Sequence, residues 1–237
     1  AAATACAGII VGVVLKTGLG LGLANGLISA AGGNVLLTLI FTMLASLVLG
    51  MGSPTTANYV ITSTIAAPAI ITLLTLDLDP NVAVPLTVAL SAHLFVFFFG
   101  IVADITPPVA LAAFAASGIS GGDPIKTGVT SAKLAIAAFI IPYMFVFNPA
   151  LLMIDSSLLE IVWVTLTALI GMIAIGAGMI GYWYRACKWY ERIVITATGF
   201  LLIFPETLTD IIGLSLFLVL FIIQYKTQEK DEEVAVA

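Results

Sequence analysis

Uncharged apolar runs follow one another along most of this chain and leave few folds open to it. Hydrophobic residues make up 61% of the sequence and charged residues only 9%, whereas a soluble domain carries about 25% charged residues. The runs are continuous rather than alternating, which favours transmembrane helices over a β-barrel. We therefore expect an all-α integral membrane protein that crosses the bilayer several times.

A short polar segment, residues 50–57, separates the apolar runs 35–49 and 59–76. It contains Pro54 and several hydroxyl side chains but no charge. Irregular backbone inside a membrane is tolerated only where protein buries it or where it lines a polar cavity. We expect a re-entrant helical hairpin over residues 35–76 with this segment at its tip. Two short crossings with the tip at a membrane surface are the alternative.

A second interruption, residues 103–108, follows the apolar run 82–102. Its two prolines, Pro107 and Pro108, remove two backbone donors and prevent a regular helix from continuing. We predict a discontinuous transmembrane helix over residues 82–118, whose half-helix ends and unwound carbonyls can bind ions. Paired broken elements of this kind are typical of the central site of a transporter.

The remaining segments read as ordinary helices and loops. Asp79 or Asn81 is expected to cap the helix that begins near residue 82, with Pro80 in its first turn. Asp123 is expected to cap a helix over residues 124–147. Beyond it, a full crossing is expected over residues 161–184. Two short apolar runs, 193–204 and 211–225, suggest a shallow hairpin around residue 205.

The chain is expected to divide into three parts. Residues 1–34 would be the end of a membrane helix and a connecting segment, helical or flexible, and residues 35–153 a transport core repeat. Residues 154–237 would form C-terminal membrane helices and a charged cytoplasmic tail. Because the sequence starts without Met in the middle of an apolar run, we expect it to be a fragment of a longer membrane protein.

Charged residues in the loops predict the orientation. Arg185, Lys188 and Arg192, with aromatic residues around them, mark a cytoplasmic interface. Counting back, the loops at 148–160 and 77–81 lie outside, and they carry acids but no Lys or Arg. The hairpin tip would then enter from outside and meet the broken helix near mid-membrane. The C-terminus would be cytoplasmic.

Hydroxyl groups at the hairpin tip are candidate ligands. Ser53, Thr55 and Thr56 can offer hydroxyl and carbonyl oxygens to Na⁺, since hard cations favour oxygen ligands, or hydroxyls to a substrate carboxylate. Local satisfaction of the backbone by these side chains is the alternative. Asn58, at the start of the second arm, can contact substrate or only bond across helices.

Asp104 follows a long apolar run, where a carboxylate is costly and marks a functional site by default. It can coordinate a cation or carry a proton. The alternative is that it caps the second half-helix together with Thr106. His93 is a candidate member of a proton relay, although a structural histidine inside the bundle is the stronger reading.

Other classes of function find little support in the sequence. One histidine and two distant cysteines, Cys6 and Cys187, leave nothing to assemble into a nucleophile, a metal centre or a disulfide, so we do not expect an enzyme. There is no basic patch for nucleic acid. A channel calls for a continuous polar lining, and the sequence has two local breaks instead.

Four segments resemble the large membrane subunit of TRAP (tripartite ATP-independent periplasmic) transporters, above all the type in which small and large membrane subunits are fused. They are residues 6–12, 50–60, 93–110 and 116–121, and the resemblance covers about residues 5–152. Ile-Thr-Pro-Pro-Val followed by Ala-Ser-Gly-Ile is its most specific feature. Many large subunits carry an uncharged residue where this chain has Asp104, whereas the fused type resembles it.

The resemblance implies an elevator-type secondary transporter built from two inverted repeats, of which this chain would hold the second, C-terminal half. Such a permease sits in the bacterial cytoplasmic (inner) membrane. It takes organic acids from a periplasmic substrate-binding protein and is driven by an ion gradient, usually Na⁺, with H⁺ as the alternative. The first repeat and the small-subunit region would lie N-terminal. Another elevator-type anion or carboxylate transporter, or a non-transporting membrane scaffold, is the alternative function.

The predicted site combines both interruptions, with no cofactor besides the coupling ion and no metal besides Na⁺. The predicted ion ligands are Gly52, Ser53, Thr55, Thr56, Asp104, Thr106 and Pro107. The predicted substrate-binding residues are Ser53, Pro54, Asn58 and Pro108.

Overall fold

The computed structural model describes residues 2–79, 82–204 and 206–236, and over these residues it contains helices and no β-strand. The all-α prediction is therefore confirmed. Contacts divide the chain into two compact units, which are described separately: residues 1–132 with 138–152, and residues 133–137 with 153–237. The three-part division by role stays a prediction.

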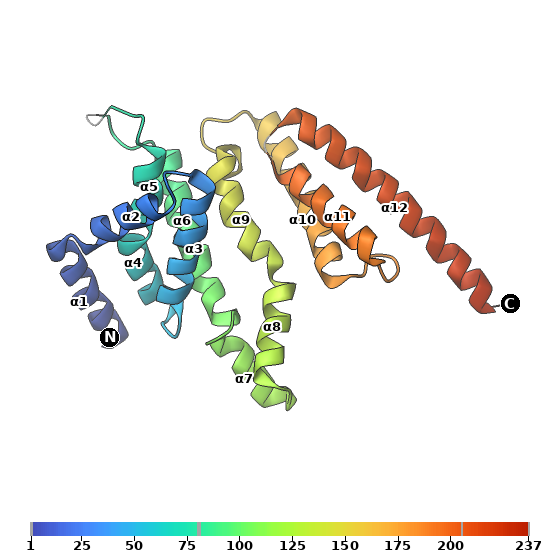
Figure 1. The fold of residues 1–237 in the computed structure, drawn as a ribbon, viewed down its shortest axis with the longest axis horizontal. Coiled ribbons are helices and arrows are strands. Elements are labelled where there is room, and N and C mark those ends of the chain that lie inside the picture. The colour runs from blue at the N-terminus through green and yellow to red at the C-terminus, as the bar shows by residue number, and fades with distance from the viewer. Residues whose placement is uncertain (1, 80–81, 205, 237) are drawn as a thin grey trace. The chain divides into compact units, whose positions relative to one another are not determined.

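The helices of the first unit run in chain order from the N-terminus (Figure 1). They are α1 (Ala2–Thr17), α2 (Leu19–Ala30), α3 (Val35–Gly50), α4 (Thr55–Ile65), α5 (Ala67–Leu74), α6 (Leu86–Val102), the 3₁₀ turn η1 (Ala103–Ile105), α7 (Leu111–Ser120), α8 (Pro124–Leu134), α9 (Ile136–Phe147) and the 3₁₀ turn η2 (Pro149–Leu152). The second unit contains α10 (Leu158–Ile180), α11 (Trp189–Ile203) and α12 (Thr207–Val236).

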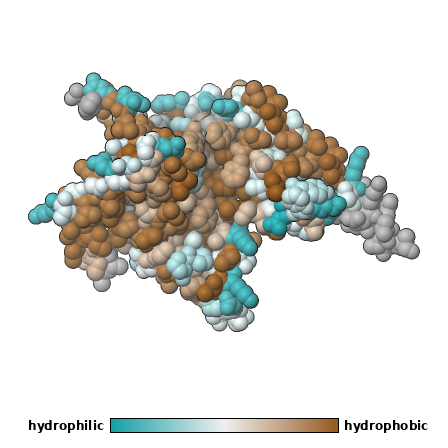
Figure 2. Space-filling model, in the orientation of Figure 1, coloured by the Kyte–Doolittle hydropathy of each residue, from teal (hydrophilic) through white to brown (hydrophobic). Residues whose placement is uncertain are grey.

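Several described helices are long and apolar enough to cross a membrane. They are Thr55–Leu74, Leu86–Ile105, Leu158–Ile180 and Thr207–Thr227, and two bent pairs, α1 with α2 and α8 with α9, pass the same test. Apolar residues cover much of the face shown in Figure 2. The protein is therefore a multi-pass membrane protein.

A bend at Gly18 joins the first two helices. Gly18 adopts the left-handed conformation, with φ of 67°, and the axes of α1 and α2 differ by 70°. The segment from Lys16 to Gly33, for which a helix and a flexible loop were both open, is mostly helical because α2 packs against α5.

The hairpin has a shorter tip than predicted. Asn34 caps α3 by accepting a hydrogen bond from the Leu37 N–H at 3.0 Å, and α4 starts at Thr55, so only residues 51–54 are outside helices. Pro54 occupies the N-cap position of α4, so the helix starts at the next residue. The second arm, α4 with α5, reaches 20 residues. That length suffices for a crossing, and re-entry stays a prediction.

The discontinuous helix starts later than predicted. α6 begins at Leu86 rather than near residue 82, because Pro85 occupies the N-cap position and disfavours a helical conformation at the residue before it. Asp79, one of the two predicted caps, does not cap α6, because the helix starts later and Pro85 occupies its N-cap position. The alternative cap at Asn81 and the turn at Pro80 lie outside the described residues.

The cap predicted for α8 is confirmed, since the Lys126 N–H donates to Asp123 Oδ1 at 2.8 Å. The single helix predicted over residues 124–147 is instead divided at Ala135 into α8 and α9, whose axes differ by 42°.

α6 forms the centre of the first unit. Its Phe95 and Phe99 are fully buried. Both rings pack edge-on against Tyr143 of α9, with centroids 5.1 and 5.8 Å away. α3, α4 and α5 also contact α6, so the hairpin packs directly on the discontinuous helix (Figure 1).

In the second unit, α10 and α11 approach backbone to backbone. A Cβ added at Gly199 would lie 2.6 Å from the carbonyl oxygen of Gly171, and one added at Gly171 would lie 2.9 Å from the carbonyl oxygen of Gly199. Close approach through small residues is the usual way in which membrane helices pack. The two glycines are therefore essential to this helix pair.

A buried carboxylate fixes the loop between α10 and α11. Glu191 accepts hydrogen bonds from Arg185 Nη2 at 2.6 Å, from the Lys188 N–H at 2.9 Å and from Gln224 Nε2 of α12 at 2.9 Å. Burial alone would raise the pKa of Glu191, but the hydrogen bonds from Lys188 and Arg185 outweigh it and lower the pKa below its usual value. The loop is therefore tied to both following helices.

A second polar contact joins α10 to the start of α12. Trp163 Nε1 donates to Asp210 Oδ2 at 2.8 Å. α12 is a longer helix than the short run predicted, because its apolar part covers the 21 residues Thr207–Thr227. Pro205, around which a shallow hairpin was predicted, lies outside the described residues.

Candidate functional site

Asn58 connects the hairpin to the discontinuous helix. Its side-chain Nδ2 donates to the carbonyl oxygen of Gly100 at 2.6 Å, and the side chain is only 1% exposed. The acceptor lies near the end of α6, where the interruption frees backbone carbonyls. The two breaks predicted from the sequence therefore meet in the folded chain.

Two glycines make room for this amide. A Cβ on Gly50 would lie 2.8 Å from Asn58 Nδ2, 2.8 Å from the Gly100 oxygen and 2.9 Å from the Cβ of Ala103. A Cβ on Gly100 would lie 2.9 Å from both polar atoms of the Asn58 side chain. The end of α3, the start of α4, the end of α6 and η1 thus converge on one point.

Buried polar atoms without partners lie on the same helices. Asn58 Oδ1, Thr42 Oγ1 and Ser46 Oγ are buried, and nothing in the described part of the chain hydrogen-bonds them. A buried polar atom left unpaired costs about 1–3 kcal/mol. Such oxygens suit a bound cation or water, because hard cations are held by carbonyl, amide and hydroxyl oxygens.

The residues predicted at the hairpin tip lie between the end of α3 and the first turn of α4. Gly52 takes a left-handed conformation with φ of 74°, and Ser53 Oγ makes a long bond of 3.4 Å to the Gly50 oxygen. Pro54, Thr55 and Thr56 are exposed at the start of α4. No structural contact assigns them to an ion or a substrate, and their roles stay predictions.

The second interruption is displaced toward the C-terminus relative to the prediction. Ala103–Ile105 continue α6 as a 3₁₀ turn, and α7 starts only at Leu111. Thr106 Oγ1 donates to the Val102 oxygen at 2.7 Å and so satisfies one freed carbonyl. The two prolines help to account for the gap, since each lacks a backbone N–H and disfavours a helical conformation at the residue before it.

Asp104 does not cap the second half-helix. It lies half-buried in η1 and makes no hydrogen bond within the described chain, while Ala110 occupies the N-cap position of α7. Pro107 packs toward Gly128 of α8, and Pro108 is exposed. The role predicted for this carboxylate stays a prediction.

The half-helices that follow the breaks start without a side-chain cap. Neither α4 nor α7 has a side chain accepting from its first N–H groups. Asn34, Asp123 and Ser157 supply such caps to α3, α8 and α10, whereas α2 and α6 also lack one. Free N–H groups and the helix dipole favour an anion, such as a carboxylate.

His93 pairs with a tyrosine of the hairpin. The hydroxyl of Tyr59 lies 3.1 Å from His93 Nδ1, and the Tyr59 ring packs edge-on against Phe97. Tyr59 follows Asn58 directly, so the only histidine of the sequence lies on the same α4–α6 contact as the amide bridge.

Some residues at this site were not selected from the sequence. Gly100, a small residue in an aromatic run, and Gly50 both flank the Asn58 amide. Thr42 and Ser46 lie four residues apart in an otherwise apolar helix, a spacing that places them on one face. The spacing of Thr42 and Ser46 could have been recognised in the sequence. The contact of Gly100 with Asn58 could not, because it joins distant segments of the chain.

Comparison with known families identifies two parts of the chain. A family model described as "Tripartite ATP-independent periplasmic transporter, DctM component" matches residues 1–159. A second model, described as "Domain of unknown function (DUF3394)", matches residues 161–217. No curated protein and no solved structure shows a significant match.

Proposed function

The chain belongs to the DctM component family of tripartite ATP-independent periplasmic transporters and is a permease component of a secondary transporter. We propose that a Na⁺ gradient drives the uptake of organic acids by this permease. The substrate would arrive from a periplasmic binding protein at the bacterial inner membrane. A small membrane subunit region and the first transport repeat would complete the permease, and the C-terminus would be cytoplasmic.

The observation that carries this proposal is the amide bridge of Asn58. It fixes the hairpin tip against the broken helix, and it leaves Oδ1 buried without a partner. A cation seated beside Oδ1 would satisfy this oxygen and stabilise the contact between α4 and α6. The bound ion would thus strengthen the same contact that orders the hairpin tip, which is how ion binding and substrate binding can be coupled.

Ser53, Thr55 and Thr56 would add ligands from the tip, and Asp104 would add the one negative charge near the bridge. The Gly52, Thr106 and Pro107 carbonyls would complete the ion site. An organic acid would use Ser53, Asn58 and the backbone beside Pro54 and Pro108, together with the uncapped N-termini of α4 and α7. These assignments extend the predicted site. No arginine contributes to binding the carboxylate, because the two arginines of the sequence are Arg185 and Arg192.

Proton coupling is the second candidate, because Tyr59 and His93 form a hydrogen-bonded pair next to the bridge. A histidine changes charge near neutral pH and can pass a proton. If protons drive uptake, His93→Gln abolishes the pH dependence. If Na⁺ drives uptake, the same variant keeps the Na⁺ dependence.

The test is uptake by the full-length protein, reconstituted with its binding protein, while Na⁺ and pH are varied independently. We expect Asn58→Ala to weaken the Na⁺ dependence about tenfold or more, equivalent to 1.4 kcal/mol. Asp104→Asn should abolish uptake or change its coupling ion. Asn148→Ala is a matched control, since that buried amide oxygen serves only the nearby Ala150 N–H.

Wild-type uptake with unchanged ion and pH dependence in both Asn58→Ala and Asp104→Asn would refute the proposed site. Uptake that is independent of both gradients in the wild type would refute ion-driven transport itself.

A further inference from the structure

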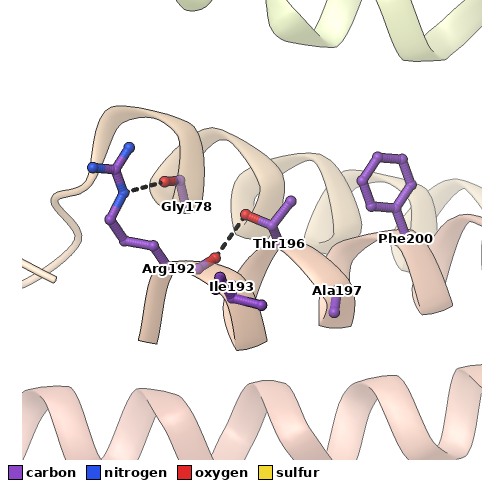
Figure 3. Close-up of a pocket in the computed structure, with 6 residues that line it drawn as sticks. All are labelled: Gly178, Arg192, Ile193, Thr196, Ala197 and Phe200. Carbon is purple, nitrogen blue, oxygen red and sulfur yellow. Dashed lines mark hydrogen bonds between the residues drawn. The ribbon is translucent and has the colours of Figure 1, made fainter. Parts of the chain in front are cut away.

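The second unit carries an apolar groove with a cation at one end. The groove has a volume of about 420 Å³ and runs between α10 and α11 (Figure 3). It is lined by Gly178, Arg192, Ile193, Thr196, Ala197 and Phe200. None of these residues belongs to the proposed transport site.

Gly178 lets α10 and α11 pack closely beside the groove. A Cβ added at Gly178 would collide with Thr196 Oγ1 and come within 2.8 Å of Ile195 Cγ2. Thr196 Oγ1 donates to the Arg192 carbonyl oxygen at 2.8 Å, so its hydroxyl is satisfied along the helix (Figure 3). Apart from Arg192 at one end, the lining therefore offers mainly carbon surface.

Arg192 lies over the C-terminal end of α10. Its Nε donates to the Gly178 oxygen at 2.9 Å (Figure 3). Its Nη2 donates to the Met179 oxygen at 2.9 Å. These bonds orient the guanidinium and use two of its five N–H groups, which leaves three without a partner in the described chain. Gly181 permits this position, since a Cβ there would lie 3.1 Å from the guanidinium carbon.

The neighbouring charges favour an anion. Arg185, Lys188 and Arg192 supply three cations against one carboxylate, Glu191. Glu191 is engaged by Arg185, so Lys188 and Arg192 are the exposed charges. Trp189, which is 74% exposed, lies beside them, as is usual at a membrane–water interface.

We propose that this groove binds an anionic phospholipid, with its phosphate on the free N–H groups of Arg192 and an acyl chain along the apolar wall. The fork of a guanidinium suits phosphate oxygens. Basic pockets between membrane helices are a recognised setting for anionic head groups. This site would give the segment that matches a domain of unknown function a role in lipid binding.

The test uses the full-length protein in nanodiscs that contain mixtures of phosphatidylglycerol and phosphatidylcholine. Native mass spectrometry of the released protein counts the retained lipids. We expect a retained phosphatidylglycerol in the wild type and a loss of about tenfold or more in its retention for Arg192→Gln, equivalent to 1.4 kcal/mol. Excess inorganic phosphate should not displace it, because phosphate lacks the acyl chain.

Arg192→Gln also removes the cap of α10 and can affect folding. Ala197→Trp is therefore the second variant: it fills the groove, leaves every charge in place, and should reduce retention to the same extent. Lys226→Gln removes an exposed cation outside the groove, and Val194→Trp adds the same bulk to α11 outside the lining. Both should retain the lipid as the wild type does.

Unchanged retention in Ala197→Trp would overturn the proposal. So would an equal loss in Lys226→Gln and Arg192→Gln, which would indicate attraction by charge alone. Displacement of the lipid by inorganic phosphate would show that the site binds a free anion and does not require a lipid. A cross-link from Ile193→Cys to another protein segment, in place of lipid, would show that protein fills the groove.

Discussion

The two units both depend on pairs of glycines, but they use them differently. In the first unit, Gly50 and Gly100 flank the amide of Asn58, and the space that they leave is filled by a polar side chain. In the second unit, Gly171 and Gly199 face each other, and the space is filled by backbone. The first pair forms a pocket for a functional group, and the second pair forms a packing surface.

One buried polar side chain from each unit shows a further difference. Asn58 Oδ1 is buried and unpaired, whereas both carboxylate oxygens of Glu191 have partners in the second unit. An unpaired oxygen can accept a ligand, and a fully paired carboxylate stabilises a loop. The comparison therefore predicts that changes beside the Asn58 amide affect transport, while changes at the α10–α11 contact and at Glu191 affect folding.

The largest effect is expected for Gly100→Ala. Its Cβ would lie 2.9 Å from Asn58 Nδ2 and Oδ1, and would displace the amide that joins the two breaks. Overpacking costs about 1–3 kcal/mol, which corresponds to about a 5- to 150-fold loss in occupancy of the site. Initial uptake rate per folded molecule is the measurement.

Gly118→Ala is the control for this variant, because a Cβ at this helical glycine would meet nothing within 4 Å. Its uptake should match the wild type. Equal losses in the two variants would contradict the functional role of the Gly50–Gly100 pair.

A smaller effect, on stability, is expected for Gly199→Ala. The added Cβ would lie 2.6 Å from the Gly171 oxygen and force α10 and α11 apart. Destabilisation of about 1–3 kcal/mol should lower the melting temperature and the folded yield, while uptake per folded molecule stays near normal. Gly176→Ala, with nothing within 4 Å of the added Cβ, should behave as the wild type. If Gly199→Ala lost uptake but kept its stability, the proposed difference between the two glycine pairs would be contradicted.

The third prediction concerns the stability of the protein at low pH. The pKa of Glu191 is lowered in the folded state: burial opposes the shift, but the bonds from Lys188 and Arg185 outweigh it. Its stabilisation is therefore complete above the usual glutamate pKa of about 4.3 and is lost as pH falls through the lower folded value. Relative to Glu191→Gln, the wild type should be about 1–2 kcal/mol more stable at neutral pH. This advantage should shrink below about pH 4.3.

Melting temperature in detergent, measured against pH for both proteins, tests this expectation. A difference between wild type and Glu191→Gln that does not change with pH would show that the carboxylate charge contributes nothing.

The smallest effect is expected at the helix caps, where the two units should behave alike. Asn34 caps α3 and Ser157 caps α10, each by accepting one N–H bond. Replacement of either by Ala should cost about 1 kcal/mol and leave uptake unchanged. A fall in uptake for Asn34→Ala alone would extend the functional region to the start of the hairpin.

The sequence predicted the elements of the fold better than their ends. The long apolar runs identified the helices of both units, and Asp123 marked the start of α8 correctly. Helix ends near prolines moved, since Pro54 and Pro85 act on the residues beside them in ways that apolar runs do not show. The breaks were found because prolines and glycines are local signals.

The candidate site could be predicted only in part. Asn58 was selected because it is an amide beside a break, and its acceptor on Gly100 lies 42 residues away. A contact over that separation follows from how α4 packs on α6, which no local pattern contains. For the same reason the pairing of Tyr59 with His93 was not foreseen.

The hydrogen bond between Trp163 and Asp210 has a practical consequence for spectroscopy. The sequence has three tryptophans, Trp163, Trp183 and Trp189, and all of them belong to the second unit. Intrinsic tryptophan emission therefore follows the melting of the second unit and does not directly register that of the first. The substitution Phe97→Trp would place a fluorescent side chain at the contact between α4 and α6, so the same emission measurement would then report on the first unit.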